Sequence, residues 1–381
     1  MAISINATGL SVWPIQSLEK FFIAGPCSVE SRDQIRDVAM RMAKLPVRVL
    51  RGGVWKPRTR PGMFAGVGIE GLRWLKDAGR EAGLPVATEV ASPEHVEACL
   101  KHNIDILWIG ARSTVNPFSV QNIADALKGV DIPVLVKNPL NPDIELWIGA
   151  LERLSHAGIK RLAAIHRGFS SYRKTTYRNT PNWAIPLELR RRIPALPLLC
   201  DPSHICGTSK LLQAVAQEAM DLLFDGLMIE VHPDPARALS DAAQQITPET
   251  LGKLLGRLRF RKAASDNEEI GRKIGYLRRE IDELDDHIIE LLGRRMEVSR
   301  ELGLCKGRHN ISTFQPKRWG EIVKTRIAAG MHKKLSRDFI ARVWELIHEE
   351  SIRHQEMARG GGRIGLKKSG GPTCQKKKKI T

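Results

Sequence analysis

The stretch KFFIAGPC, residues 20–27, is the first of eight similar apolar runs that decide the fold. Its apolar part, Phe21–Ala24, is typical of a short buried strand, and the Gly-Pro pair that follows ends that strand. The next residue is Cys27, so a thiol occupies the turn beyond a strand tip. A lone cysteine in such a turn is most often an inert thiol, so its role depends on what else reaches the same place.

Seven more runs rich in Val, Ile and Leu follow, and segments with helical spacing separate most of them. The eight runs are KFFIAGPC (20–27), VRVLRGG (47–53), LPVATEV (84–90), ILWIGAR (106–112), PVLVKNP (133–139), RLAAIHRG (161–168), LPLLCDPSH (196–204) and GLMIEVH (226–232). Strand–helix alternation repeated eight times over roughly 250 residues predicts an α/β fold, the (β/α)8 TIM barrel. A doubly wound open sheet is the alternative, but it rarely contains eight such units.

Chemically capable side chains follow nearly every predicted strand. They are Cys27, Arg51, Glu89, Arg112, Lys137, Arg167, Asp201 with His204, and Glu230 with His232. In a barrel, catalytic groups gather at the carboxyl ends of the strands. Scattered surface charge would not follow the strand ends so closely, and the pattern therefore predicts one active site at that end.

Four of these side chains form a candidate metal site: Cys27, His204, Glu230 and the nearby Asp241. Mixed sulfur, nitrogen and oxygen ligands suit a divalent transition ion such as Mn²⁺, with Fe²⁺, Co²⁺ or Zn²⁺ as alternatives. The four residues are far apart in the sequence and form no spacing motif, but a barrel would bring them together. Taken singly, Cys27 would be an inert thiol and His204 a capping or structural histidine.

A second group is cationic and consists of Arg51, Lys56, Arg58, Arg112, Lys137 and Arg167. So many cations around one barrel mouth would repel each other without an anionic ligand. Arginine offers forked donors to carboxylate and phosphate, and lysine offers a point charge. The group therefore predicts a phosphorylated substrate, although Arg58 could instead lie on a solvated loop.

Length, cysteine usage and hydropathy narrow the class of protein. A chain of 381 residues suggests two to three domains. No stretch approaches the roughly 20 apolar residues that a membrane helix needs. The start, MAISINATGLSVW, lacks the pattern of a signal peptide. Six cysteines without a CxxC pair favour free thiols in a reducing compartment, so we expect a cytoplasmic protein.

The net charge of +18 is concentrated in part at the end of the chain. Residues 359–381 carry eight Lys or Arg and no acidic residue, and without them the net charge is +10. This Gly- and Lys-rich segment has little to bury, so we expect a disordered, solvated tail. A basic run can bind nucleic acid, but the remaining charge suits small anionic substrates equally well, and we expect no nucleic-acid partner.

The motifs of the first 260 residues resemble those of 3-deoxy-D-arabino-heptulosonate 7-phosphate (DAHP) synthase of the short type Iβ form. The resemblance is carried by AGPCSVE, KPRT (56–59), GAR (110–112), DPSH (201–204) and EVHPDPARALSD (230–241). It implies a barrel over residues 1–260 that condenses phosphoenolpyruvate with erythrose 4-phosphate and releases phosphate. A 3-deoxy-octulosonate 8-phosphate synthase is the nearest alternative, but that family has a KANR-like loop where this chain has KPRT.

The resemblance also implies roles for single residues. Cys27, His204, Glu230 and Asp241 would hold the metal, which would polarise the aldehyde. Phosphoenolpyruvate would be bound by Arg51, Lys56, Arg112, Lys137 and Arg167. Arg58 and Thr59 would bind erythrose 4-phosphate, and Lys56 would give a proton to the nascent alkoxide.

Beyond residue 265 the strand pattern stops and a helical pattern begins. Leu277, Ile281, Leu284, Ile288 and Leu291 follow steps of four and three, which predicts a long helix with a heptad-like seam. Shorter helices are predicted near 317–328 and 336–357. On the third helix the row Val343, Ile347, Ser351 and Gln355 turns from apolar to hydrogen-bonding. This row could face a ligand, or it could be a solvated helix end.

Residues 265–358 resemble chorismate mutase of the all-helical AroQ class, through LRREIDELDDHIIELLGRRMEVSRELGLCK and EESIRHQ. The resemblance implies rearrangement of chorismate to prephenate without nucleophile or metal. The site would be lined by Arg278, Arg295, Lys306, Ser351 and Gln355. The two arginines would clamp the carboxylates, and Lys306 and Gln355 would stabilise the ether oxygen.

Helix length makes one protomer insufficient for this site. Arg278 and Arg295 are 17 residues apart on one helix, which corresponds to about 26 Å. We therefore expect a homodimer through the helical domain. The sequence also departs from the family, which has acidic residues at the start of the second helix where this chain has Gln315 and Trp319. The mutase could therefore be weakened, or kept as a sensor.

Three hypotheses follow for the whole chain. The first is a bifunctional enzyme whose mutase domain also feeds back on the synthase through the polar connection RFRKAASDNEE (259–269). The second is a DAHP synthase whose helical domain is only a regulatory ligand-binding module. The third, a basic nucleic-acid-binding protein, is disfavoured because much of the charge is in the tail and the chain has three tyrosines for stacking.

Overall fold

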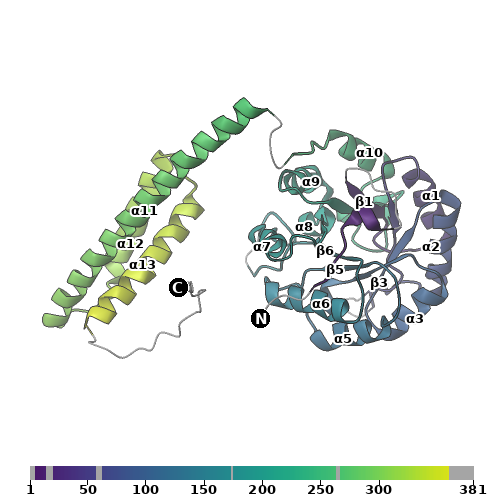
Figure 1. Ribbon diagram of the computed structural model, residues 1–381, viewed down its shortest axis with the longest axis horizontal. Helices are drawn as coiled ribbons and strands as arrows, with labels where there is room; N and C mark the ends of the chain where they lie inside the picture. Colours follow the sequence, from purple (N-terminus) through teal and green to yellow (C-terminus); the bar gives the residue numbers. More distant parts are fainter. Residues whose placement is uncertain (1–4, 14–19, 57–61, 173–174, 263–266, 360–381) are drawn as a thin grey trace, which may run out of the picture. The chain divides into compact units, whose positions relative to one another are not determined.

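The computed structural model describes residues 5–13, 20–56, 62–172, 175–262 and 267–359. Within these limits the chain divides into two compact units, residues 1–263 and 264–381. Figure 1 shows a barrel in the first unit and a helical bundle in the second. The predictions for Arg58, Thr59 and residues 360–381 lie outside the described residues, as does the centre of the connection, residues 263–266.

Eight parallel strands form a closed barrel in sequential order. They are β1 (Phe21–Gly25), β2 (Val49–Arg51), β3 (Val86–Val90), β4 (Ile106–Ile109), β5 (Val134–Lys137), β6 (Leu162–His166), β7 (Leu198–Cys200) and β8 (Gly226–Glu230). The last strand pairs with the first over its whole length, from Phe21 opposite Gly226 to Gly25 opposite Glu230. The predicted (β/α)8 barrel is confirmed, and this closure excludes the doubly wound open sheet.

Ten helices surround the strands in the described part of this unit (Figure 1). They are α1 (Arg32–Met42), α2 (Ile69–Ala82), α3 (Pro93–Lys101), α4 (Ala111–Thr114), α5 (Pro117–Ala126), α6 (Ile144–His156), α7 (Ala184–Arg192), α8 (Pro202–Cys206), α9 (Leu212–Asp221) and α10 (Pro248–Arg257). Several begin at a side-chain cap, as where Ser31, Ser92 and Asp143 accept hydrogen bonds from the first turn. Such caps satisfy amide groups that have no partner within the helix.

Two apolar cores result from the alternation of side chains along each strand. One lies between the strands and the helices, and the other fills the barrel interior. Trp108 of β4 is completely buried in the interior core. Its indole Nε1 donates to Glu89 at 3.0 Å, and the Arg51 guanidinium lies 4.8 Å from its ring centre. Trp108 therefore joins the apolar interior of the barrel to the charged groups at the strand ends.

The second unit consists of α11 (Glu268–Arg308), α12 (Pro316–His332) and α13 (Arg337–Arg359). The first helix is 41 residues long. The second extends further than predicted, and Ile340 lies against the small residue Gly330 in its last turn. None of the described helices is both long and apolar enough to cross a membrane.

The predicted heptad-like seam lies on α11 and is exposed. Leu277, Ile281, Leu284, Ile288 and Leu291 are 46% to 66% exposed. Buried residues of this helix are found only further along, at Met296, Ser299, Gly303 and Lys306. The amino-terminal half of α11 therefore carries an apolar face that the described residues of one protomer leave uncovered.

Candidate functional site

The residues that follow the strands converge at the carboxyl end of the barrel. Because all strands are parallel and the barrel is closed, their carboxyl ends share one rim. Arg51 ends β2, Lys137 ends β5 and Glu230 ends β8. All three side chains are almost fully buried. Charged groups are rarely buried unless they are paired or bind a ligand, so this rim is the candidate active site.

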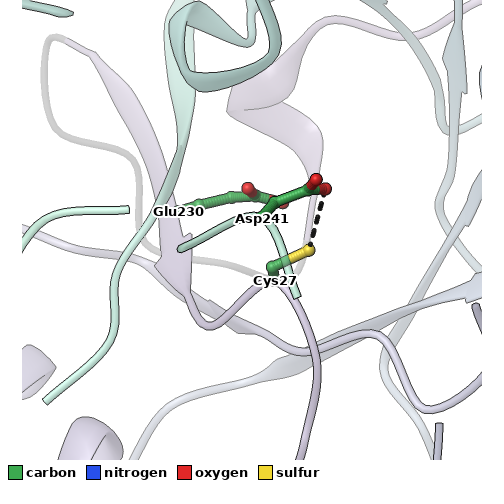
Figure 2. A group of neighbouring side chains, drawn as sticks. All are labelled: Cys27, Glu230 and Asp241. Carbon is green, nitrogen blue, oxygen red and sulfur yellow. Dashed lines mark hydrogen bonds between the residues drawn. The ribbon is translucent and has the colours of Figure 1, made fainter. Parts of the chain in front are cut away.

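Three of the four predicted metal ligands form a tight group (Figure 2). One ligand atom from each of Cys27, Glu230 and Asp241 lies within 4.8 Å of the others. The Cys27 thiol donates to Asp241 Oδ2 at 3.5 Å. The buried Glu230 Oε1 accepts no hydrogen bond from the described residues. A thiol and two carboxylates in such a group fit a divalent transition ion.

The fourth predicted ligand, His204, lies beside this group. It belongs to the short helix α8, whose first turn is capped by Asp201, a residue that accepts from the His204 amide at 3.0 Å. The other carboxylate oxygen of Asp201 is 2.8 Å from His204 Nδ1. This contact directs Nε2 to within 3.8 Å of Glu230 Oε1. A carboxylate that orients a histidine in this way is common around protein-bound metals.

Ionisation of the group depends on its burial and on its cations. Burial, with a contribution from Glu230, raises the pKa of the Cys27 thiol to about 12. Burial acts to raise the pKa of Asp241 as well, but Arg178 and His204 outweigh it and lower that pKa to about 2. The thiol is therefore protonated and the carboxylate ionised at neutral pH. A bound cation would stabilise the thiolate, because thiol ligands bind metal deprotonated.

Arg51 is the most deeply placed cation of the rim. Its guanidinium is 1% exposed and lies 3.2 Å from Glu230 Oε1. It also donates to the Cys27 backbone oxygen at 3.2 Å. Its Nε donates no hydrogen bond within the described part of the chain, whereas Nη1 is the atom that pairs with Glu230. Buried donors without acceptors are costly, so they indicate a place for an anionic ligand.

Three more of the predicted cations lie at the same rim, while Arg58 falls outside the described residues. Lys137 donates to the buried Asp201 at 2.7 Å, and Lys56 donates to Cys27 Sγ at 3.1 Å. Arg167, 5% exposed, donates to Asn179 Oδ1 at 2.7 Å. The pKa of Arg167 is lowered to about 10, mainly by burial and also by the nearby Arg178 and Arg112, while Asp201 acts in the opposite direction. The cations are thus close enough to act on one ligand.

The sequence reasoning missed three polar side chains that hold the rim in place. Gln244 donates to Glu230 Oε2 at 2.6 Å and accepts from Arg178 at 2.7 Å. Arg178 also pairs with Asp241 at 3.0 Å. Gln245 accepts from the Cys27 amide at 3.0 Å. None of the three follows a strand directly, so the strand-end pattern could not find them.

In the helical unit, Arg295 of α11 faces α13. Its guanidinium contacts the hydroxyl of Ser351 and donates to the backbone oxygen of Ile347 at 3.4 Å. The Ser351 hydroxyl also donates to Ile347 O at 2.9 Å, and Ser299 lies 3.3 Å away. Ser351 therefore holds Arg295 in position, and its hydroxyl has several partners within the protein.

Lys306 lies about three turns beyond Arg295 on α11, and Gln355 lies about one turn beyond Ser351 on α13. Lys306 is 7% exposed and donates to Thr313 O at 2.8 Å. Gln355 is 6% exposed, and its Oε1 accepts no hydrogen bond from the described residues. The helices approach closely here, since a Cβ at Gly303 would lie 2.6 Å from the Gln355 backbone. Glycine at 303 thus places Gln355 against the face of α11 that carries Lys306.

Two features of the helical unit bear on the remaining predictions. Arg278 lies on the same helix as Arg295, and its side chain is exposed. Gln315 caps α12 without a side-chain hydrogen bond, and the Trp319 ring stacks on His348 of α13 at 4.0 Å between centroids. A Trp–His stack therefore occupies the position where the resemblance to AroQ chorismate mutases predicts an acidic residue.

Comparison with known families gives two matches along the chain. Residues 16–260 match the DAHP synthetase I family. Residues 277–356 match the chorismate mutase type II family. The two matched segments fall within the two compact units, one in each.

Known relatives resemble the barrel unit. A phospho-2-dehydro-3-deoxyheptonate aldolase of Thermotoga maritima is 34% identical over 61% of this chain and 67% of its own length. A 2-dehydro-3-deoxyphosphooctonate aldolase of Bordetella petrii is 28% identical over 62% of this chain and 88% of its own. The crystal structure of a Thermotoga maritima DAHP synthase matches with a TM-score of 0.59 and 31% identity, covering 66% of this chain and 71% of that one.

The buried pair Lys137–Asp201 provides a test of the rim. The Lys137→Met substitution should leave an ionised carboxylate buried without its cation and destabilise the barrel by about 3–5 kcal/mol. Urea unfolding of the full chain, followed by tryptophan fluorescence, measures the change. Lys128→Met is the matched control, because Lys128 pairs with Asp125 at the same kind of distance, 2.8 Å, on the surface. This control should lower the free energy of unfolding by less than about 1 kcal/mol. Equal losses of stability in the two variants would contradict the role assigned to burial.

Proposed function

The chain belongs to the DAHP synthetase I family and carries a second domain of the chorismate mutase type II family, and from this premise we propose that it catalyses both reactions. Both domains are those of shikimate-pathway enzymes. The barrel would condense phosphoenolpyruvate with erythrose 4-phosphate to DAHP, and the helical unit would rearrange chorismate to prephenate.

The observation that carries the synthase proposal is the buried guanidinium of Arg51, whose Nε lacks a hydrogen-bond acceptor beside the Cys27–Glu230–Asp241 group. Guanidinium and ammonium groups suit the phosphate and carboxylate of phosphoenolpyruvate. Arg51, Lys137, Arg167 and Arg112 would bind this substrate. Placing it against the metal group would bring its enol carbon to the aldehyde of the second substrate.

The metal proposal rests on the donor set of the barrel rim. Cys27, His204, Glu230 and Asp241 would hold one divalent ion, for which Mn²⁺ is our first choice. When bound, such an ion supplies Lewis-acid polarisation of an aldehyde oxygen. Asp201 keeps His204 oriented, and Gln244 orients Glu230.

Lys56 would act at the same place. Its ammonium lies 3.1 Å from Cys27 Sγ, so it would be close to an aldehyde oxygen held at the metal group, the oxygen that becomes an alkoxide when the new carbon–carbon bond forms. Proton transfer from Lys56 to this oxygen would complete the addition. The phosphate-bearing carbon would then add water and release phosphate. Arg58 and Thr59 would hold erythrose 4-phosphate.

An octulosonate 8-phosphate synthase is the second candidate for the barrel. It is favoured by the 28% identity with enzymes of that name. The relative named for heptulosonate chemistry is more similar, at 34% identity. Comparing erythrose 4-phosphate with arabinose 5-phosphate as the acceptor substrate decides between them, and we expect a preference for the tetrose.

For the helical unit, the supporting observation is the group of Arg295, Lys306 and Gln355 on facing helices. Burial lowers the pKa of both Arg295 and Lys306, and such desolvated cations interact strongly with an anion. Arg295 would bind a carboxylate of chorismate. Lys306 and Gln355 would donate to the ether oxygen, which gains negative charge as its bond to carbon breaks.

The geometry of α11 supports the proposal of a homodimer. Arg278 and Arg295 are 17 residues apart on this straight element, or about 26 Å, which no chorismate-sized molecule spans. A second protomer would bring its Arg278 to the first protomer's Arg295. The same association would cover the exposed seam Leu277–Leu291, a large apolar face of the kind that marks protein interfaces.

Feedback between the units is the last part of the proposal. Prephenate is made downstream of the barrel's product, so a mutase domain is a natural place to sense pathway output. Prephenate would inhibit the synthase only if the chain has an active and an inactive arrangement of its units, and if prephenate binds the inactive arrangement more tightly than the active one.

Removing the thiol tests the metal site. The Cys27→Ser substitution should strongly weaken Mn²⁺ binding and abolish synthase activity while the fold persists, because a hydroxyl is a poor ligand for such ions. Equilibrium dialysis with Mn²⁺ and a synthase assay with and without chelator measure both effects. Cys305→Ser, at an exposed thiol of the helical unit, is the control and should change neither. Full activity of the metal-stripped wild type would refute the proposal.

Subunit mixing tests the dimer and the mutase site together. The Arg278→Ala and Arg295→Ala variants should each lose chorismate turnover, and chelator should not affect the wild type. Mixed and reassembled, they should recover about one quarter of the wild-type turnover, because half of the dimers then contain one intact site of two. No recovery after demonstrated subunit exchange would argue against a shared site. If Arg295→Ala turned over chorismate as fast as the wild type, the role of Arg295 in binding a carboxylate would be refuted.

Synthase kinetics with added prephenate test the feedback. We expect inhibition of the wild type, and typical coupling of about 1–3 kcal/mol corresponds to a roughly 5- to 150-fold change in affinity. The inhibition should disappear in Arg295→Ala, which retains the barrel site. Small-angle scattering should show a change in dimensions with the same ligand. Unchanged kinetics at saturating prephenate would leave two enzymes that merely share a chain.

A further inference from the structure

Trp319 of α12 stacks on His348 of α13 in the helical unit. The two rings lie 4.0 Å apart with 15° between their planes, and Phe314 lies 5.9 Å from the imidazole on another side. On α13, His348 precedes Ser351 by three residues and Gln355 by seven. Residues with this spacing share one face of a helix. His348 therefore belongs to the same stripe as the two residues already placed in the site.

Two polar atoms of this stripe have no partner. His348 Nε2 is buried and makes no hydrogen bond to the described residues, and the same holds for Gln355 Oε1. Buried polar atoms are nearly always hydrogen-bonded in proteins, so an exception requires an explanation. Ser351 differs, because its hydroxyl already interacts with Arg295, Ser299 and Ile347 O. The unpartnered atoms are thus the two ends of the stripe.

The surroundings of His348 favour a neutral imidazole. Burial lowers its pKa, and the positive charges of Arg295 and Lys306 lower it further, while Glu349 acts weakly in the other direction. A neutral imidazole offers a donor at one nitrogen and an acceptor at the other. It suits an uncharged polar group of a ligand, whereas the neighbouring cations suit its carboxylates.

Chorismate contains one such uncharged group besides its ether oxygen. It has two carboxylates, which the arginines would bind, an ether oxygen, which Lys306 and Gln355 would contact, and a ring hydroxyl. The acidic residues that hold this hydroxyl in the related family are replaced by Gln315 and Trp319. In the described part of the helical unit, His348 Nε2 is an unpartnered buried atom that none of these roles uses.

We propose that His348 contacts the substrate of the helical site, with Nε2 hydrogen-bonded to the ring hydroxyl, and that Trp319 is a positioning residue that fixes the imidazole plane by stacking. This inference rests on the proposed mutase function and assigns its hydroxyl contact to this chain's own residues. The Trp–His pair then replaces the acidic contact rather than abolishing it. The substrate class is a hydroxylated cyclic dicarboxylate.

Chorismate turnover by full-chain variants tests the contact. His348→Leu should lower kcat/KM for chorismate by about 10- to 100-fold, the usual effect of losing one hydrogen bond to a substrate in a polar site. His348→Gln keeps a hydrogen-bonding group at that position and should recover most of the loss. His354→Gln is the matched control, because His354 lies on the same helix and its ring already pairs with Glu350 at 3.0 Å. It should behave as the wild type.

A chorismate analogue without the ring hydroxyl distinguishes the loss of a hydrogen bond to the substrate from structural damage caused by the substitution. The wild type should process it less efficiently than chorismate, and His348→Leu should cause no further loss with it. Trp319→Leu should lower kcat/KM for chorismate in the same direction as His348→Leu, with no further loss in the double variant. An equal loss with both substrates, or no loss with chorismate, would overturn the proposal while leaving the mutase function standing.

If the wild-type protein does not convert chorismate, the binding of prephenate can be measured instead. Calorimetry should then give a dissociation constant about 10-fold weaker for His348→Leu than for the wild type or His354→Gln. Equal dissociation constants would overturn the contact alone. A wild type that neither turns over chorismate nor binds prephenate would overturn the contact together with the mutase function.

Discussion

The pairing of β1 with β8 is the constraint on which the barrel site depends. Its register sets Gly25 opposite Glu230, and the Val231 amide donates to Gly25 O at 2.8 Å. Cys27 follows two residues after Gly25, so closure of the barrel alone brings the thiol to the carboxylate (Figure 2). At Gly25 φ is +151°, and a Cβ would lie 2.0 Å from Arg51 O. Only glycine lets the three strands approach in this way.

Charge balance at the rim follows from burial. Glu230 faces Arg51, Asp201 faces Lys137, and Asp241 faces Arg178. Each buried carboxylate has a cation, since an unpaired one would cost several kcal/mol. Further cations, Lys56 and Arg167, bring the rim to an excess of positive charge that an anionic substrate would neutralise. The same carboxylates hold the cations apart and oriented before substrate arrives, which is the preorganisation that electrostatic catalysis needs.

The helical unit solves a different problem, because the reaction proposed for it needs neither metal nor nucleophile. It needs cations and neutral donors at fixed positions. Within one protomer, two features fix the positions of these groups. They are the close approach of the helices at Gly303 and the contact of Arg295 with Ser351. The long exposed seam of α11 leaves this unit with apolar surface to cover, and a shared site would couple assembly to catalysis.

The sequence by itself determined the barrel, the strand ends that carry chemistry and the long helix, because hydrophobic periodicity and turn residues are local properties of the chain. It placed Arg51, Lys137 and Glu230 correctly at strand ends because a parallel barrel puts every such end on one rim. Only the tertiary structure brought Arg178, Gln244 and Gln245 to that rim, since they lie in a loop and at the end of a short 3-10 helix, whose positions no local pattern fixes. It alone stacked Trp319 on His348, because packing between helices is set by side chains far apart in the sequence.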